Sequence, residues 1–296
     1  MNTDEVKVVI GFSTNFYISN NRLYYKFFKK FYAINYIKVP IYLKNMKILL
    51  IGGTGYVGKA IKNELNKIGL SVISIGTSTN PNFIIGEEVD ENIFTNIDYV
   101  LYLSWNFDTR DKEYSKKNIE SFQKVNNICR KNKIKLFFIS TLLASSDSKS
   151  KYNKTKAACE NIAIKSGFSV LRLGTVLLEG YDLTGTYGKI SNFVSKYKIY
   201  PRIHPNKAVF EKTDIKNIKE ICLSLNSLEN KIYTFTNGNN LTLEKILNLQ
   251  NKYSISIPIH WVMIYFPLKI LEIFKLPSSL RSDMVKSIWQ EGSNGK

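Results

Sequence analysis

The sequence has little histidine, cysteine and proline, and it is poor in acidic residues. Its 296 residues include two histidines, three cysteines and seven prolines, and 24 acidic residues stand against 42 basic ones. Only His204 and His260 can supply imidazole, which argues against a histidine-built metal site, and no Cys-x-x-Cys pair indicates zinc. Cys129, Cys159 and Cys222 are too far apart for a disulfide framework. We therefore expect no metal and a reduced, cytoplasmic compartment.

We also expect no segment that carries the chain across a membrane. The opening residues Met1 to Glu5 do not form a basic stretch followed by an apolar one, which argues against a secretory signal. The most apolar segment, 255–274, is interrupted by Pro258, His260, Pro267, Lys269 and Glu272. We expect a buried or substrate-covering pair of helices there, and no stable membrane span.

What the sequence has in excess is positive charge, with a formal net charge of +18. Such a charge suits nucleic acid or an anionic membrane surface. The abundant Lys, Asn, Ile, Tyr and Phe all have AT-rich codons, however, so codon bias alone produces the same balance. Because the lysines are scattered and no nucleic-acid motif accompanies them, we expect no nucleic-acid partner. The charge would still suit an anionic substrate.

A glycine-rich turn organises the chain. Residues 47–51 predict a buried strand, and Gly52, Gly53 and Gly55 form a turn before a helix. One face of that helix carries Val57, Ile61, Leu65 and Ile68. Glycines let the backbone take positive φ and approach a pyrophosphate closely, and the helix N-terminus attracts the same group. The strand-turn-helix unit therefore predicts a dinucleotide site.

From Met46 the pattern alternates strands and helices, which indicates a parallel sheet covered on both faces. Strands are expected at 47–51, 71–75, 83–85, 98–104, 135–140 and 169–173, with helices over 112–131 and 151–165. Beyond Gly174 we expect helices at 188–198, 215–225 and 243–252, the last two capped by Asp214 and Thr242, and a strand at 231–235. The sequence thus predicts an α/β fold, a Rossmann-type doubly wound parallel sheet. Residues 46–176 would form the cofactor-binding domain with the catalytic residues, and 177–296 a small, mostly helical substrate-binding region.

Residues 1–45 do not fit this pattern. Between Arg22 and Lys44 aromatic side chains alternate with lysines, upstream of the point where the Rossmann domain would begin. The segment is an extension packed on the core, a basic aromatic segment at a membrane surface, or an upstream stretch included by a wrong start codon. We favour the first and third interpretations.

Tyr152 and Lys156 lie four residues apart on a predicted helix, so their side chains share a face. A nearby ammonium favours the phenolate and lowers the tyrosine pKa from its usual ~10 toward the working range. The pair is a candidate proton-transfer unit, although a chance Tyr-x-x-x-Lys is easily found in this composition. It follows a strand that ends in Ser140 and Thr141, whose hydroxyls would emerge at the carboxyl edge of the sheet, where open α/β folds bind ligands.

In this context the chain resembles the extended short-chain dehydrogenase/reductase superfamily, which includes nucleotide-sugar epimerases, dehydratases and ketoreductases. Gly52-x-x-Gly55-x-x-Gly58 matches its phosphate loop, and Tyr152-x-x-x-Lys156 its catalytic pair. Its other motifs are matched in chain order by the strand and loop from Asp98 to Trp105, the helix residue Asn118, the strand end from Ile139 to Thr141, and the strand and turn from Leu171 to Val176. The resemblance covers residues 46 to about 225.

The resemblance implies hydride exchange between a substrate carbinol or ketone carbon and a nicotinamide. Tyr152 would pass the proton, Thr141 would hydrogen-bond the substrate oxygen with Ser140 as its alternate, and Lys156 would hold the cofactor ribose and tune Tyr152. Asn118 is either a polar residue on an exposed helix face or part of a proton relay. The expected cofactor-binding residues are Gly52, Thr54, Gly55, Tyr56, Val57, Gly58, Thr77, Ser78, Leu103, Ser104, Ser140, Tyr152, Lys156, Leu173, Thr175 and Val176.

Two local departures refine the expectation. Leu142 and Leu143 follow Thr141 where 4,6-dehydratases of the superfamily carry Asp-Glu, so a ketoreductase or a compact epimerase fits better than a dehydratase. At the end of the second strand, Gly76 to Thr79 has no carboxylate to repel a 2′-phosphate, and Thr77 and Ser78 offer hydroxyls to it. NADP is therefore slightly favoured over NAD, although no arginine is present there.

Together these features predict an NAD(P)-dependent oxidoreductase or epimerase of a nucleotide-activated sugar, acting in surface polysaccharide synthesis. Lys189, Lys196, Lys198 and Arg202 are either contacts for the substrate diphosphate or ordinary solvated side chains. Two alternatives stay open: a dinucleotide-binding scaffold without turnover, and a membrane-surface reductase of a lipid-linked substrate. The sequence also leaves open a homodimer, the identity of the sugar and the carbon that reacts.

Overall fold

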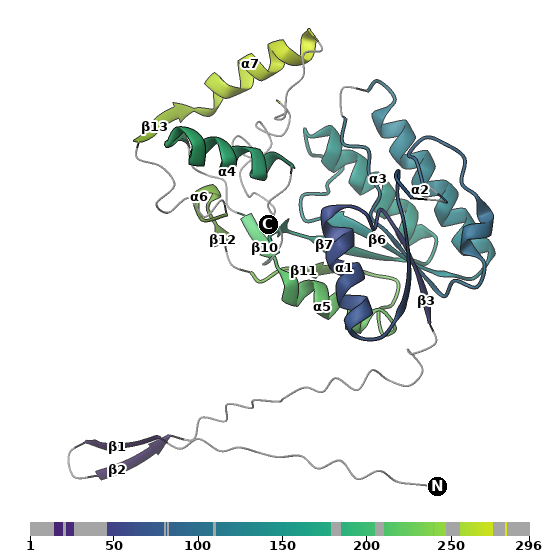
Figure 1. Ribbon diagram of the computed structural model, residues 1–296, viewed down its shortest axis with the longest axis horizontal. Helices are drawn as coiled ribbons and strands as arrows, with labels where there is room; N and C mark the ends of the chain where they lie inside the picture. Colours follow the sequence, from purple (N-terminus) through teal and green to yellow (C-terminus); the bar gives the residue numbers. More distant parts are fainter. Residues whose placement is uncertain are drawn as a thin grey trace. The chain divides into compact units, whose positions relative to one another are not determined.

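We describe the protein from a computed structural model. It describes residues 15–19, 22–26, 46–79, 81, 83–108, 111–178, 185–204, 210–238, 240–246, 255–274 and 282. The chain divides into two units, residues 1–39 and 40–296 (Figure 1). In the first unit, β1 (Asn15–Ser19) and β2 (Arg22–Lys26) pair in an antiparallel hairpin. The remainder of the predicted 1–45 extension lies outside the described residues.

The second unit is built on a six-stranded parallel sheet, in the order β11-β7-β6-β5-β3-β4. The strands are β3 (Lys47–Ile51), β4 (Ser71–Ile75), β5 (Tyr99–Tyr102), β6 (Lys135–Thr141), β7 (Ser169–Leu173) and β11 (Ile232–Phe235). This confirms the predicted α/β class and all of the predicted sheet strands except one. The strand expected at 83–85 is wrong, because Phe83 instead donates its backbone N–H to the Gly76 carbonyl within a loop.

Four helices cover the sheet: α1 (Tyr56–Lys67), α2 (Tyr114–Lys131), α3 (Lys151–Lys165) and α5 (Ile215–Ser224). Helix α1 packs with α5 and α2 packs with α3, so the two pairs lie on opposite faces of the sheet (Figure 1). The predicted cap Asp214 begins α5 and accepts bonds from the backbone N–H groups of Lys216 and Asn217.

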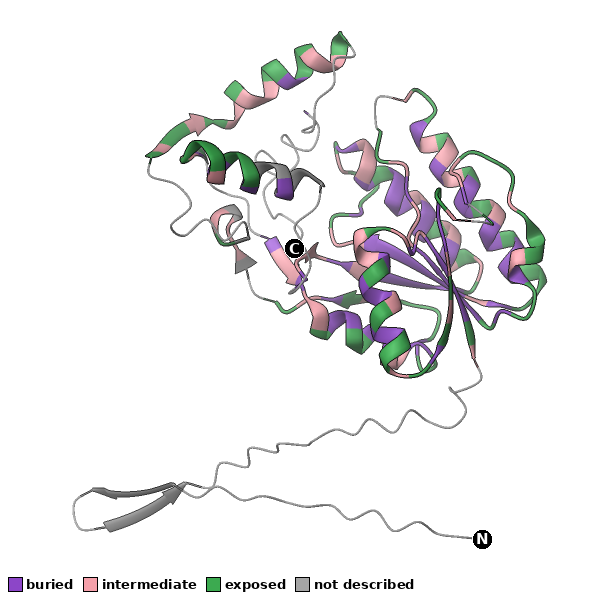
Figure 2. Cartoon of the chain, viewed as in Figure 1, coloured by how far each residue is buried: buried purple, intermediate pink, exposed green. Residues whose placement is uncertain are grey.

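The core under α2 and α3 is aromatic. The Phe122 ring centroid lies 4.6 Å from that of Phe138 and 5.1 Å from that of Tyr102, and all three side chains are fully buried. The three cysteines lie in α2, α3 and α5, and all are buried free thiols. Figure 2 shows that the central strands are mainly buried, and removal of their apolar side chains from water favours folding.

Beyond β7 the chain adds two smaller sheets. Strands β8 (Thr175–Val176), β10 (Phe210–Thr213) and β12 (Asn240–Leu241) form one, and β9 (Ile199–His204) pairs in parallel with β13 (Ile255–His260) to form the other. The helices of this part are α4 (Gly185–Tyr197), α6 (Leu243–Ile246) and α7 (Trp261–Ile273). The end of the helix expected at 243–252 lies outside the described residues.

The helix pair expected over 255–274 is wrong. Its first part is strand β13, since the alternating Ile255, Ile257 and Ile259 favour a strand and Pro258 disfavours helical backbone in the residue before it. The helix α7 begins only after His260, whose side chain accepts a bond from the Val262 N–H. Within the described part of the chain, none of the helices combines the length and the apolar character that crossing a bilayer requires.

One ion pair ties α3 to the sheet beside the end of β6. Arg172 on β7 donates from Nε and Nη2 to the two carboxylate oxygens of Glu160, at 2.8 and 2.5 Å, and from Nη2 to the Ala144 carbonyl at 3.3 Å. The Glu160 side chain is only 4% exposed and that of Arg172 26%. The hydrogen bonds that Arg172 donates to Glu160 raise the pKa of Arg172. The pair therefore joins α3, β7 and the loop after β6.

We expect Glu160→Gln to lower the free energy of unfolding by about 3 kcal/mol, because it leaves the Arg172 guanidinium without its carboxylate in a largely buried place. Urea unfolding of the two proteins measures the difference. The matched control is Lys231→Ala, which removes an exposed pair with Glu229, with side chains 66% and 75% exposed, and should change the value by less than about 0.5 kcal/mol. Equal effects of the two substitutions would contradict the role given to Glu160.

Candidate active site

The glycine turn after β3 is held by two close backbone approaches. Gly52 has a φ of +88°, and a Cβ there would lie 2.6 Å from the Ser104 nitrogen in the loop after β5. A Cβ at Gly58 would collide with the carbonyl oxygen of Gly52 and the Cα of Gly53. These two positions require glycine for the packing of the turn against β5 and α1, whatever else the turn does.

Gly55 is different, because the protein itself gives it no steric reason to be glycine. It is exposed, its φ of −75° and ψ of 174° suit any residue, and a Cβ there would meet only the Gly52 carbonyl oxygen, at 3.4 Å. It caps helix α1, whose first turn has no acidic residue and no side-chain cap. A Cβ would fill the open space beside this helix N-terminus, where the helix dipole favours an anion. The turn therefore fits the pyrophosphate of a dinucleotide.

The loop after β4 lies against this turn. A Cβ at Gly76 would collide with Oγ1 of Thr54, so the predicted cofactor residues of the turn and of the β4 end lie close together. Thr79 closes the loop, since its Oγ1 accepts a bond from the Gly76 N–H at 2.8 Å. The side chains of Thr77 and Ser78 are exposed, as contact with a ribose or its 2′-phosphate requires.

At the carboxyl end of β6, two hydroxyls differ in their surroundings. The Ser140 Oγ is buried and has no hydrogen-bond partner among the described residues, which is costly for a polar atom. The Thr141 Oγ1 is half-buried and accepts a long bond, 3.4 Å, from the Leu143 N–H. An unsatisfied hydroxyl at this edge of the sheet is a second feature that suits a polar ligand.

Tyr152 and Lys156 lie on one face of α3 and meet the aromatic side chain that follows β5. Lys156 Nζ donates to the Ile139 carbonyl at 3.0 Å and lies 3.9 Å from the centroid of the Trp105 ring. The Trp105 ring also meets Tyr152 edge to face at 5.9 Å, and Phe107 stacks on Tyr152 at 6.2 Å. Trp105 and Phe107 were not among the predicted site residues. The signal that could have found them is two bulky aromatic residues directly after a predicted strand.

Burial controls the ionisation of Lys156, which is only 4% exposed. Desolvation lowers its pKa from 10.5 to about 7, against the opposing effect of Cys159 and Glu160. Burial also raises the pKa of Cys159 to about 12, so this thiol is neutral at pH 7. The Trp105 ring and the Ile139 carbonyl both favour the ammonium form. Lys156 therefore changes its charge close to neutral pH.

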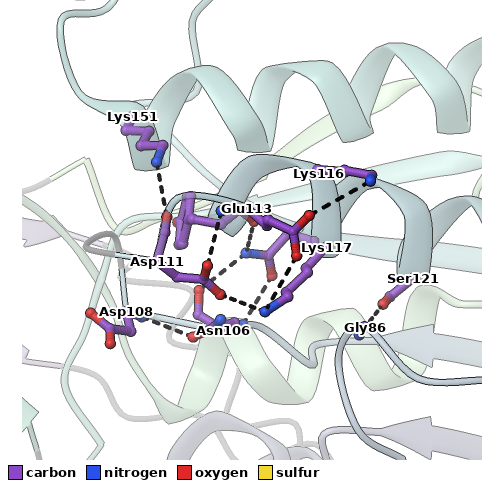
Figure 3. A network of polar contacts seen from close by, with 11 residues as sticks. Gly86, Asn106, Asp108, Asp111, Glu113, Lys116, Lys117, Ser121 and Lys151 are labelled. Atoms are coloured by element: carbon purple, nitrogen blue, oxygen red, sulfur yellow. Dashed lines mark hydrogen bonds and ion pairs between the residues drawn. The ribbon is translucent and has the colours of Figure 1, made fainter.

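The loop between β5 and α2, which carries Trp105 and Phe107, is fixed by a polar network (Figure 3). Asn118 is fully buried, so its placement on an exposed helix face is wrong. Its Oδ1 accepts the Asn106 N–H at 2.9 Å, and its Nδ2 donates to the carbonyls of Asn106 and Tyr114. Lys117 binds Asp111 at 2.9 Å in the same network. The amide of Asn118 thus positions the loop, and its bonds to the backbone leave little capacity for a proton relay.

The remaining predicted residues lie at the ends of neighbouring strands. The N–H groups of Leu103 and Ser104 both donate to the Ile51 carbonyl, and the Leu173 carbonyl accepts the Leu142 N–H. Thr175 and Val176 are half-buried and form β8, which pairs with β10. The Tyr56 hydroxyl at the start of α1 accepts the Leu178 N–H at 3.1 Å. The described residues contain no group of three or more His, Cys, Asp or Glu side chains that could hold a metal ion.

No protein-family model and no curated protein sequence matches the chain, but solved structures do. The UDP-glucose 4-epimerase of Thermotoga maritima, solved with UDP-glucose, is 19% identical, and the match covers 72% of this chain and 86% of that one with a TM-score of 0.57. The UDP-glucose 4-epimerase of Thermus thermophilus in complex with NAD is 21% identical, and the match covers 73% of this chain and 86% of that one with a TM-score of 0.56. MoeE5 in complex with UDP-glucuronic acid and NAD is 14% identical, and the match covers 72% of this chain and 85% of that one with a TM-score of 0.60. The chain has the fold of these two epimerases and of MoeE5, as the resemblance implied.

The lowered pKa of Lys156 predicts a pH-dependent contribution to stability. Between about pH 7 and 10.5 the unfolded chain carries the proton that the folded protein lacks, so stability in this window rises with pH. We expect the unfolding free energy of the native protein, relative to that of Lys156→Met, to rise by about 1.4 kcal/mol per pH unit near the middle of the window. Denaturant unfolding at several pH values measures it. A difference that does not change with pH would show that Lys156 titrates at its usual value.

Proposed function

We propose that this chain is an NAD(P)-dependent oxidoreductase or epimerase that acts on a nucleotide-activated sugar. One observation carries the proposal: adjacent residues after β5 touch both halves of the site. Ser104 packs against Gly52 of the glycine turn, and Trp105 contacts both Tyr152 and Lys156. A phosphate-binding turn and a candidate acid/base pair therefore belong to one site at the carboxyl edge of a parallel sheet, where folds of this class bind ligands.

The dinucleotide would be held by residues whose geometry fits it. The open space at Gly55 and the N-terminus of α1 would take the pyrophosphate. Thr77 and Ser78 would contact the adenosine ribose, and the absence of a carboxylate beside them supports the slight preference for NADP. The buried Ser140 hydroxyl would gain a partner. When bound, the nicotinamide supplies a hydride donor or acceptor.

The chain's own residues would move the proton. Tyr152 Oη would give a proton to, or take one from, the substrate oxygen, and Thr141 would donate a hydrogen bond to that oxygen. Lys156 uses one N–H on the Ile139 carbonyl and carries two more in its ammonium form, which suit ribose hydroxyls. A charged Lys156 favours the Tyr152 phenolate, so the pair responds to pH near neutrality.

The substrate class rests on the fold likeness and on local chemistry. The related folds were solved with UDP-glucose and UDP-glucuronic acid, and basic residues are abundant in this chain. Leu142 and Leu143 supply no carboxylate after Thr141, which supports a ketoreductase or an epimerase over a dehydratase. Surface polysaccharide synthesis is the role that we propose for such a reaction.

The test of cofactor binding is Gly55→Ala. We expect an unchanged or slightly higher unfolding temperature, because Ala suits this backbone geometry, and an affinity for NADPH and NADH at least tenfold lower, because the Cβ fills the phosphate position. Fluorescence titration of each cofactor measures the affinity. Gly58→Ala is the contrast, since its clash within the turn should lower stability as well. Unchanged cofactor affinity in Gly55→Ala, or no binding by the native protein, would contradict the site.

The test of chemistry is Tyr152→Phe. We expect kcat to fall by about 10²- to 10⁴-fold because the proton-transfer group is lost, whereas cofactor affinity should fall far less because the phosphate-binding turn at Gly55 is intact. Turnover of UDP-glucose and UDP-N-acetylglucosamine would be followed by nicotinamide absorbance and by chromatography of the sugar products. Tyr197→Phe, which changes an exposed tyrosine of α4, is the control. A native protein that binds cofactor but turns over no nucleotide sugar would instead support the scaffold alternative.

A further inference from the structure

Helix α7 presents an apolar stripe to solvent. Its members are Met263, Phe266, Ile270, Ile273 and the following Phe274, and each is between 53% and 70% exposed (Figure 2). At 3.6 residues per turn, these five positions fall within an arc of roughly 100°. That is the width of the face that an amphipathic helix normally buries against a protein core. Here the part of the chain that the structure describes leaves it exposed.

The opposite side of α7 is the one that packs on the protein. Leu268 is 8% exposed and lies about 170° around the helix from the middle of the stripe. Glu272 also lies away from the stripe, where its two carboxylate oxygens accept the N–H and hydroxyl of Ser282 at 2.7 and 2.6 Å. The helix is therefore docked by one face, and the stripe is not a core surface that has merely failed to pack.

The region that carries α7 has an excess of positive charge. In the segments 185–204 and 255–274, which are joined by the pairing of β9 with β13, Lys196, Lys198, Arg202 and Lys269 are exposed and Glu272 is the one acidic residue. Lys269 borders the stripe and is half exposed; its Nζ lies 3.8 Å from Oε2 of Glu272, whose carboxylate also accepts the bonds from Ser282. An exposed apolar helix face in a region with an excess of basic side chains is the composition that binds an anionic lipid surface.

Helix α4 of the same region repeats this composition. Phe193 and Tyr197 are 47% and 52% exposed, and their ring centroids lie 4.8 Å apart. Lys196 places its Nζ 5.1 Å from the Tyr197 ring.

We propose that α7 inserts its stripe into the surface of a membrane rich in anionic phospholipid, lying in the interface without crossing it. Charge decides against a second copy of this chain as the occupant, because both copies carry +18 and would bring the same basic residues together. The site is independent of the proposed chemistry, and loss of either function leaves the other measurable.

The test is flotation of the full-length protein with vesicles of phosphatidylglycerol or of phosphatidylcholine. We expect the native protein to float with phosphatidylglycerol and not with phosphatidylcholine. Ile270→Ser should weaken binding at least tenfold, whereas Ile73→Ser, the same change at a 44% exposed isoleucine on strand β4, should leave it unchanged. Lys269→Gln should weaken binding about fivefold, the loss of about 1 kcal/mol for one lysine near the surface.

A fluorescence measurement at single positions tests the proposal independently, in case Ile270→Ser lowers the stability of the protein. The native cysteines are buried, so an environment-sensitive dye can be attached at Met263→Cys and, as control, at Ile73→Cys. Phosphatidylglycerol vesicles should shift the emission of the first dye to the blue and leave the second unchanged. The proposal fails if neither dye responds to the vesicles, or if Ile270→Ser and Lys269→Gln both float like the native protein. It also fails if the stripe mediates self-association or binds an acidic protein and the protein does not bind lipid.

Discussion

The candidate site depends on the close approach of the glycine turn to the backbone after β5. Gly52 lies so near Ser104 that any side chain would force the two segments apart, and the Ile51 carbonyl binds the N–H groups of both Leu103 and Ser104. Trp105 comes next in the chain, so its position over Lys156 is set by the same contact. A change at Gly52 would therefore reach the proton-transfer pair through two residues of backbone.

Around Lys156 the structure balances two opposing demands. Removal from water disfavours its charge, while the Trp105 ring and the Ile139 carbonyl favour it. The Glu160–Arg172 pair ties helix α3 to β7 and to the loop after β6, and so holds Lys156 in this place. The same packing that secures the fold thus holds an ammonium group near its titration point beside Tyr152.

The sequence predicted the strands of the central sheet, including the partly exposed edge strands β4 and β11, but it did not show which side of an apolar segment meets water. Strands β3 and β6 are covered on both faces, so an uninterrupted apolar run identified them. The run at 83–85 misled because Phe83 only covers the core from a loop, with its ring 5.8 Å from that of Tyr102. Composition also cannot tell which side of an apolar helix meets water, and α7 was expected to be buried. The glycine turn and the Tyr152–Lys156 pair are local patterns, whereas the contacts of Trp105 and Phe107 with Tyr152 arise only from the fold.

The bond between Tyr56 and Leu178 joins two parts of the chain that are far apart in sequence. Tyr56 lies in the first turn of α1, between two glycines of the phosphate motif, and its hydroxyl accepts a backbone N–H at the start of the carboxyl-terminal region. A ligand that moves the first turn of α1 relative to Leu178 would change that bond. By thermodynamic reciprocity, a substrate that moves Leu178 would then alter cofactor affinity at the glycine turn to the same degree. In the proposed enzyme the Tyr56 phenol would therefore couple the cofactor turn to the start of the region that we expect to bind substrate.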